Sequence, residues 1–236
     1  QVQFQDEATL LMNGTTMHGL QPVSREWSYV PTSYYTAGSG IGRALRAARD
    51  TTKGTPISVG IIGLGTGSAA AYCEPKDIFT FYEIDSDIEH IARSYFSYLP
   101  RCAGGSVKIG DGRLVLATQP IASSTYDVFA VDAFTDDAIP AHLITEEAVA
   151  LYMQHLSDNG ILAIHTSNRF LVLYPMILSI ARTQSLTAMV VFDDGTSGHL
   201  GVASQWVLLA KHPKVLEADA FIGVLRWSAP SPLPAP

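Results

Sequence analysis

The sequence has few charged residues, only two cysteines and no long apolar run. Charged residues make up 16% of its 236 positions, and the 22 Asp and Glu residues outnumber the 15 Lys and Arg residues, for a net charge of −7. Because proteins bind phosphate backbones through clustered Lys and Arg, this composition argues against a nucleic-acid partner. No segment reaches the roughly 18 to 20 consecutive apolar residues of a membrane span. We therefore expect a cytoplasmic chain.

The two cysteines offer no sign of a metal site. Cys73 and Cys102 lie in neither a CxxC pattern nor the Cys and His spacing of a zinc site. A lone cysteine is most often a small buried hydrophobe. We therefore expect two reduced thiols, no disulfide framework and no bound metal.

Short apolar runs alternate with helical patterns through most of the chain. Such alternation is typical of βαβ units that build a mostly parallel sheet. The runs that predict strands are Ile57–Ile62, Phe79–Ile84, Val107–Gly110, Tyr126–Val131, Ile161–His165, Ala188–Phe192 and Trp206–Ala210. The last two form a hairpin that completes the sheet. We predict an α/β fold with a Rossmann-like, seven-stranded sheet of the methyltransferase type.

The first 50 residues follow a different pattern. Short strand-like runs flank Asn13-Gly14, which is a strong hairpin signal. The chain ends in a Pro-rich stretch that is unsuited to packing, so the sequence predicts a piece of a longer protein. We predict three parts: a small β-hairpin appendage with its connecting segment over residues 1–50, a nucleoside-binding catalytic domain over 51–227 and a tail over 228–236.

Three motifs at the ends of predicted strands suit a nucleoside. The glycines of Gly63-Leu64-Gly65-Thr66-Gly67 follow the first strand of the parallel sheet, and they let the backbone turn sharply and approach a ligand. Glu83 ends the next strand, where a carboxylate can accept hydrogen bonds from ribose hydroxyls or remain a solvated acid. Asp111, between Gly110 and Gly112, is placed to accept the amino protons of adenine. Together they predict an adenosine moiety that carries no pyrophosphate.

Asp132 ends the fourth strand and suggests the reaction. An amine that attacks a carbon beside a sulfonium must first lose a proton, and free amines have a pKa near ~10. A carboxylate in a desolvated site can take that proton and anchor the cation. Asp132 is our candidate for this role, and the acids Asp136 and Asp137 follow it in a loop. The alternative is that these acids only cap or solvate the loop.

Together these motifs resemble those of the spermidine synthases, from about residue 10 to 211. The pattern is most similar to the bacterial spermidine synthase-like domains that are often fused to a membrane domain, whose signatures resemble residues 132–143 and 165–169. The resemblance implies decarboxylated S-adenosylmethionine as donor, methylthioadenosine as product, a putrescine-like amine acceptor, no metal and a homodimer or higher assembly. It also implies that this chain is the cytoplasmic part of a membrane-fused protein.

The resemblance assigns roles to individual residues. It gives catalytic roles to Asp132, Asp136 and Tyr34. Tyr34 and Tyr35 together are similar to an aromatic pair near the donor sulfur. His18 and Gln21 lie near the place of a glutamine that follows the family's N-terminal hairpin. The predicted cofactor-binding residues are Gly63, Gly65, Thr66, Gly67, Glu83, Ile84, Asp111, Gly112, Asp132, Gln21 and His18. His165, Arg169 and His142 are further candidates that can line the substrate pocket or make local hydrogen bonds.

One departure from the family pattern keeps other reactions open. Aminopropyltransferases carry an acid in the glycine loop that holds the donor's amino group, and Thr66 occupies that position here. A site without this acid can accept intact S-adenosylmethionine. The alternatives to aminopropyl transfer are therefore methyl transfer, cleavage or cyclisation of S-adenosylmethionine, and a non-catalytic nucleoside-binding domain.

Overall fold

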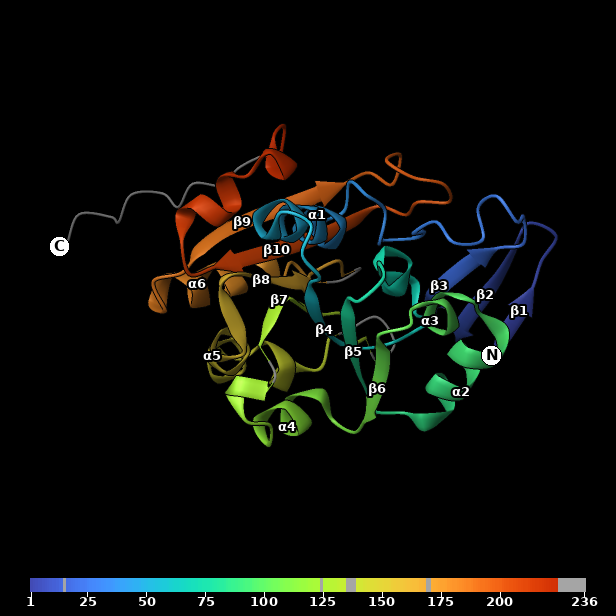
Figure 1. Ribbon diagram of the computed structural model, residues 1–236, viewed down its shortest axis with the longest axis horizontal. Helices are drawn as coiled ribbons and strands as arrows, with labels where there is room; N and C mark the ends of the chain where they lie inside the picture. The colour runs from blue at the N-terminus through green and yellow to red at the C-terminus, as the bar shows by residue number, and fades with distance from the viewer. Residues whose placement is uncertain (15, 124, 135–138, 169–170, 225–236) are drawn as a thin grey trace.

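The computed structural model describes residues 1–14, 16–123, 125–134, 139–168 and 171–224 (Figure 1). The strands are β1 (Val2–Phe4), β2 (Ala8–Asn13), β3 (Thr16–Pro22), β4 (Ser58–Ile62), β5 (Ile78–Glu83), β6 (Gly105–Ile109), β7 (Tyr126–Val131), β8 (Leu156–His165), β9 (Thr187–Asp193) and β10 (Ser204–Ala210). The α-helices are α1 (Gly40–Thr52), α2 (Ser86–Tyr95), α3 (Tyr98–Arg101), α4 (Gly112–Ala117), α5 (Glu146–Gln154) and α6 (Tyr174–Thr183). The predicted tail over 228–236 lies outside the described residues.

Seven strands form the central sheet in the order β6-β5-β4-β7-β8-β10-β9. The pairs from β6 to β8 are parallel, and β10 runs antiparallel between β8 and β9. This arrangement confirms the predicted Rossmann-like sheet of the methyltransferase type. Strand β8 begins at Leu156, five positions before the predicted start, because the polar residues 157–159 continue its extended backbone. The parallel order brings the carboxyl ends of β4 to β8 to one edge, where such sheets bind ligands.

Buried side chains on the two faces of the sheet form two cores. Neighbouring residues of a strand point to opposite faces, so Ile61 belongs to the core under α1 and Ile62 to the core under α5 and α6. Both faces of β4, β5, β7 and β8 are thus covered, as their nearly continuous apolar sequence predicts, whereas the edge strand β6 is largely exposed. Figure 1 shows α1 lying across the sheet beside β9 and β10. Trp206 is wholly buried under α1 and lies close to the start of that helix. A Cβ added to Gly40 would be 2.2 Å from the Cβ of Trp206.

The N-terminal strands form a small antiparallel sheet in the order β1-β2-β3. The predicted hairpin is β2 and β3, joined at Asn13-Gly14, and Gly14 has a φ of 57° that suits the turn. Strand β1 adds a third strand to this hairpin. In Figure 1 this sheet lies at the side of the molecule next to α2 and α3.

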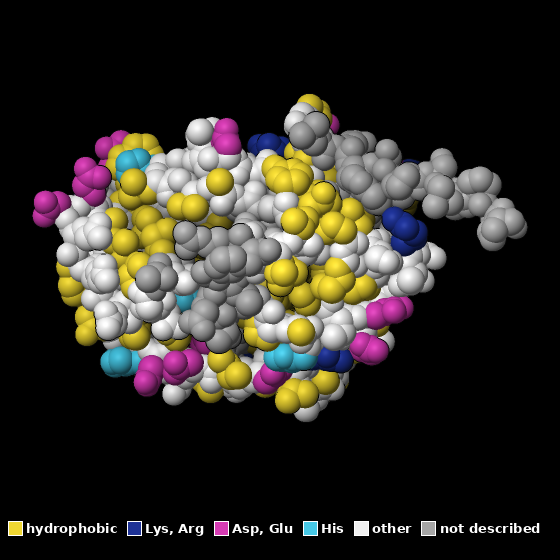
Figure 2. All heavy atoms as spheres, turned by 180° about the vertical axis from the view of Figure 1, so that it is seen from behind, with side chains coloured by type: hydrophobic (Ala, Val, Ile, Leu, Met, Phe, Trp, Pro, Cys, Tyr) yellow, Lys and Arg dark blue, Asp and Glu magenta, His cyan; other side chains and the backbone are white. Residues whose placement is uncertain are grey.

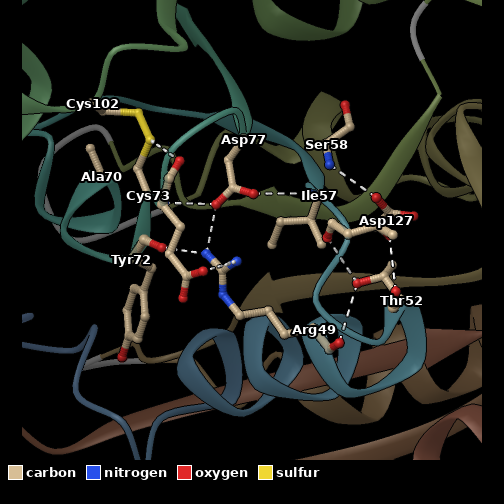
Figure 3. Close-up of polar contacts among 12 residues, drawn as sticks. Arg49, Thr52, Ile57, Ser58, Ala70, Tyr72, Cys73, Asp77, Cys102 and Asp127 are labelled. Carbon is tan, nitrogen blue, oxygen red and sulfur yellow. Dashed lines mark hydrogen bonds and ion pairs between the residues drawn. A yellow bond between two sulfur atoms is a disulfide. The ribbon is translucent and has the colours of Figure 1, made fainter.

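The expectation of two free thiols is wrong, because Cys73 and Cys102 form a disulfide (Figure 3). Cys73 follows the 3₁₀ helix η1 (Ser68–Tyr72) and Cys102 follows α3. The fold packs these two short helices together and places the Cα atoms 5.5 Å apart, within the range that a disulfide needs. The sequence gives no sign of this pairing, since 29 positions separate the two residues.

A buried ion pair stands beside the disulfide, at the amino-terminal edge of the sheet (Figure 3). The Asp77 carboxylate is 1% exposed and lies 2.7 Å from the Arg49 guanidinium. It also accepts the backbone N–H groups of Ile57 and Glu74, at 2.9 and 2.8 Å. A buried charge needs such partners. This cluster therefore stabilises the edge opposite the predicted ligand site.

Figure 2 shows the reverse face of the molecule, where hydrophobic side chains gather on both sides of the residues drawn in grey. Acidic side chains are spread around the outline of this face. Within the described residues, no helix has the length and apolar character needed to cross a membrane.

Candidate active site

The predicted site residues meet at the carboxyl edge of the sheet. Gly63 follows β4, Glu83 ends β5, Asp111 follows β6, Asp132 follows β7 and His165 ends β8. These strands are neighbours, so residues from five separate parts of the sequence share one edge. The structure thereby brings together the glycine loop and the three acids that the sequence identified.

Two positions of the glycine loop require glycine, because at each of them a different backbone segment lies too close for a side chain. Gly63 has a φ of 99°, and a Cβ there would lie 2.3 Å from the backbone oxygen of Asp132. Gly65 has a φ of 53°, and its Cβ would lie 2.6 Å from the backbone oxygen of His18. Residues other than glycine rarely adopt these angles, and no side chain fits at these distances. The loop is thus held between the end of β7 and strand β3 of the N-terminal sheet.

Glu83 fixes the backbone around the glycine loop. Its carboxylate accepts the N–H of Leu64 at 2.9 Å and that of Asp85 at 3.0 Å. Burial raises the pKa of Glu83 above its usual value, and the backbone hydrogen bonds counter part of that shift. The next residue, Ile84, is 72% exposed at the strand end. An exposed apolar side chain at this edge suits a flat aromatic base.

Asp111 caps α4 and pairs with a histidine from a distant segment. Its Oδ1 accepts the N–H of Leu114 at 3.0 Å, and its Oδ2 lies 2.8 Å from Nε2 of His142. Although desolvation acts to raise the pKa of Asp111, the hydrogen bonds from Leu114 and His142 outweigh it and lower the pKa. Asp111 thus stays ionised and able to accept hydrogen bonds.

Asp132 is buried and both of its carboxylate oxygens have partners. Oδ1 lies 2.6 Å from Nδ1 of His165, and Oδ2 accepts the hydroxyl of Tyr35. The ring of Tyr34 lies 4.9 Å from that of Tyr35 and 4.8 Å from that of His165, measured between centroids. Desolvation, and then the charge of Asp132, raise the pKa of both tyrosines well above the usual value. Both tyrosines therefore remain neutral at neutral pH.

Two predicted residues of the N-terminal sheet lie against this edge. Gln21 is buried and holds α3, since its amide exchanges hydrogen bonds with the Oγ and N–H of Ser97 at 2.7 and 2.9 Å. His18 lies against Gly65, and Thr66 is buried with its hydroxyl 2.7 Å from that of Ser68. Ligand contacts by these residues stay predictions. The predicted Asp136, with Asp137 and Arg169, lies outside the described residues.

Sequence reasoning underrated two partners of Asp132. Tyr35, rather than its neighbour Tyr34 to which the resemblance assigns a catalytic role, makes the hydrogen bond to the carboxylate. His165 was one candidate among several histidines, yet it contacts the carboxylate directly. One signal for His165 was available, because it ends the strand predicted to follow that of Asp132, and neighbouring parallel strands end side by side.

A cavity of about 710 Å³ opens at the same edge, beyond β8. Its walls come from the segment after β8, the ends of β9 and β10, and the start of α1. Within the described residues it is lined by Gly38, Arg43, Thr166, Ser167, Asn168, Leu171, Val172, Phe192, Asp193, Asp194, Ser197, Ala203, Ser204 and Gln205. None of the predicted cofactor-binding residues lines it.

Comparison with known proteins gives partial matches in sequence and broad ones in fold. No family model matches the chain. A curated polyamine aminopropyltransferase from Vibrio vulnificus (strain CMCP6) is 35% identical over 114 residues, which cover 47% of this chain and 38% of the relative. The match therefore spans little more than a third of that relative's length.

Solved structures match over most of the chain. A probable spermidine synthase from Corynebacterium glutamicum ATCC 13032 superposes with a TM-score of 0.70 at 15% identity, covering 89% of this chain and 76% of that one. The fold of this chain is thus similar to that of a probable spermidine synthase. A spermidine synthase in complex with the transition-state analogue AdoDATO matches with a TM-score of 0.58 at 16% identity, over 92% of this chain and 75% of that one. At these identities the structural matches establish the fold alone. The resemblance inferred from the motifs is confirmed, whereas fusion to a membrane domain stays a prediction.

Proposed function

We propose that this chain transfers an aminopropyl group from decarboxylated S-adenosylmethionine to a small amine and releases methylthioadenosine. The observation that carries the proposal is the convergence of Glu83, Asp111 and Asp132 beside the glycine loop, on neighbouring strand ends. The curated relative named polyamine aminopropyltransferase supports the same reaction class. The solved spermidine synthase that holds AdoDATO supports a ligand related to S-adenosylmethionine.

Each acid has a separate part in the proposed donor site. Glu83 accepts the ribose hydroxyls with the lone pairs that its two backbone contacts leave free. The exposed Ile84 packs on the adenine, and Asp111 accepts its amino protons. The glycine loop approaches the donor without a side chain in the way, and no phosphate has to be neutralised.

The proposed transfer step takes place at Asp132. The ammonium group of the acceptor gives a proton to the carboxylate, and the resulting neutral amine attacks the methylene carbon beside the sulfonium. The new C–N bond forms as the C–S bond breaks, and the product nitrogen takes up the positive charge. The electron pair of the broken bond goes to sulfur, which leaves as the neutral thioether of methylthioadenosine. Tyr34 and Tyr35 line the position of Asp132 with neutral aromatic rings, which exclude water and suit a cationic sulfonium.

Thr66 favours one alternative, the use of intact S-adenosylmethionine. Its side chain is 1% exposed, and its hydroxyl is engaged with Ser68. The glycine loop thus presents no acid at this position that would repel the carboxylate of the intact donor. In that reaction methylthioadenosine arises by cleavage or cyclisation, or a methyl group is transferred, without an aminopropyl acceptor.

Incubation with each donor, followed by mass spectrometry of the products, distinguishes these reactions. Purified protein is given S-adenosylmethionine or its decarboxylated form, each with and without putrescine. Methylthioadenosine and spermidine that appear only with the decarboxylated donor and the diamine support our proposal. Methylthioadenosine from the intact donor alone supports the alternative, and binding of methylthioadenosine without turnover of either donor refutes both.

A pair of aspartates near the two ends of β7 supplies a matched control for the base. Asp132→Asn should abolish turnover while methylthioadenosine still binds. Asp127, at the opposite end of β7, accepts the N–H of Ser58 at 2.9 Å and lies outside the site, so Asp127→Asn should retain turnover. Normal turnover by Asp132→Asn would refute its role as base.

Assembly and location follow from separate measurements. We propose a homodimer, for which light scattering of the purified protein gives the mass.

The predicted cytoplasmic location is at odds with the Cys73–Cys102 disulfide, because structural disulfides are typical of oxidising compartments. Titration of free thiols in protein taken directly from cells decides this point, since two free thiols support the cytoplasmic location and none opposes it.

A further inference from the structure

Asp132, His165 and Ser167 form a continuous chain of hydrogen bonds. Nδ1 of His165 lies 2.6 Å from Oδ1 of Asp132, and Nε2 of the same ring lies 2.8 Å from Oγ of Ser167. A nitrogen that faces an ionised carboxylate carries the ring proton, so the other nitrogen has a free lone pair. The hydroxyl of Ser167 therefore donates to Nε2. Nucleophilic serines with a His and an Asp have the same order of groups and the same contacts.

The imidazole of His165 is held in place on all sides. Its side chain is 4% exposed, and its ring stacks on Trp206 with centroids 4.4 Å apart and planes 9° apart. The ring of Phe134 meets it edge-on at 5.0 Å, and Tyr34 lies at 4.8 Å. Tyr35 fixes the second oxygen of Asp132. The base is thus oriented before any substrate arrives, as general-base catalysis requires.

Ser167 carries this chain of contacts to the surface of the cavity. It is half-buried, lies two residues past the end of β8 and lines the cavity of about 710 Å³. The N–H of Gln205 donates to its Oγ at 2.8 Å and fixes the position of the oxygen. The buried charge of Asp132 is therefore linked, through one imidazole, to a hydroxyl that a small molecule can reach.

A second hydroxyl in the cavity wall indicates that such a molecule would carry a hydrogen-bond acceptor. Ser204 is 6% exposed, and its buried Oγ has no hydrogen-bond partner among the described residues. A buried hydroxyl without a partner is unfavourable, so this position suits a hydrogen-bond acceptor from a ligand. A carbonyl oxygen that gains negative charge as its carbon is attacked is such an acceptor.

The charges around the cavity restrict the substrate. Asp193 and Asp194 contribute two carboxylates. Arg43 is the one cation among the described lining residues, and its guanidinium already donates to the backbone oxygens of Gly38 and Ala220, at 2.9 and 2.8 Å. An anionic substrate would meet net negative charge there. The cavity thus favours neutral or cationic molecules.

We propose that Ser167 is the nucleophile of a second active site, which hydrolyses small neutral or cationic carboxylic esters. Oγ of Ser167 attacks the ester carbon while its proton passes to Nε2 of His165. The C–O bond to the alcohol then breaks, and the alcohol leaves with that proton. Water, deprotonated by the same nitrogen, releases the acid from the acylated serine. This activity needs no sulfonium donor, although it shares Asp132 with the function proposed above.

A fluorophosphonate ester tests the nucleophile directly, because it forms a stable bond to activated serines with loss of fluoride. Intact-mass and peptide mass spectrometry of the treated protein should show one adduct, located on Ser167. Ser167→Ala should abolish the adduct and lower the hydrolysis of 4-nitrophenyl acetate by at least tenfold. The expected loss is similar for His165→Gln, and circular dichroism of each variant checks its fold.

Ser157 provides the matched control outside the cavity, at the opposite end of β8 from His165. Its hydroxyl donates to the carboxylate of Asp127 at 3.2 Å, so Ser157→Ala should keep both the adduct and the hydrolysis. Absence of an adduct on the wild-type protein would overturn the proposal. An adduct on another residue, or hydrolysis that Ser167→Ala leaves unchanged, would overturn it as well. None of these results depends on whether S-adenosylmethionine is turned over.

Discussion

Replacing Gly65 by alanine tests how tightly the N-terminal sheet is packed on the glycine loop. Two costs are expected at this position. A residue with a Cβ is disfavoured by roughly 1 to 2 kcal/mol in the left-handed region, where Gly65 lies with a φ of 53°. The new Cβ would also lie 2.6 Å from the backbone oxygen of His18, and such overpacking costs roughly 1 to 3 kcal/mol. The free energy of unfolding should fall by roughly 2 to 5 kcal/mol.

Gly14 separates the two costs. Its φ of 57° is nearly the same, but no heavy atom lies within 4 Å of a Cβ built there. Gly14→Ala should therefore lose only the roughly 1 to 2 kcal/mol of the backbone term. Urea unfolding of both variants measures the difference, and calorimetric titration with methylthioadenosine should show weaker binding for Gly65→Ala alone. Equal losses of stability in the two variants, with unchanged binding, would refute the packing of β3 on the loop.

Three further predictions concern stability and the nucleoside. Replacing both Cys73 and Cys102 by alanine should lower the free energy of unfolding by roughly 3.6 kcal/mol, because the disulfide closes a loop of 29 positions. The melting temperature should fall by roughly 7 to 14 °C. A melting temperature that neither this change nor a reductant alters would contradict the disulfide. Glu83→Ala should weaken the binding of methylthioadenosine measured by calorimetry, and unchanged affinity would remove the ribose assignment. Because burial raises the pKa of Tyr34 and Tyr35, their contribution to stability is complete below the unfolded tyrosine value near ~10 and is lost as the pH rises through the folded values. Thermal melts should therefore show a loss of stability above about pH 10 that Tyr35→Phe reduces.

The local pattern of the sequence determined the sheet and most of its ligand edge. Alternating apolar runs and turn residues specify strands whatever their neighbours are, and a residue that ends a parallel strand necessarily lies at the carboxyl edge. For that reason the positions of Glu83, Asp111 and Asp132 could be predicted together from their places after predicted strands. The glycines of the loop were predictable for a similar reason, since the turn after β4 requires positive φ angles.

The tertiary structure alone decided which side chains touch. The disulfide depends on how η1 packs against α3, and no local pattern encodes that distance. The contact of Asp132 with Tyr35 joins residues 97 positions apart, and its contact with His165 joins residues 33 apart. The hydrogen bond between His165 and Ser167 joins residues only two positions apart. It nevertheless depends on the orientation of the His165 ring, which stacks on Trp206 of the antiparallel strand β10. The sequence determined which chemical groups lie at the edge, and the packing of distant segments determined which of them act together.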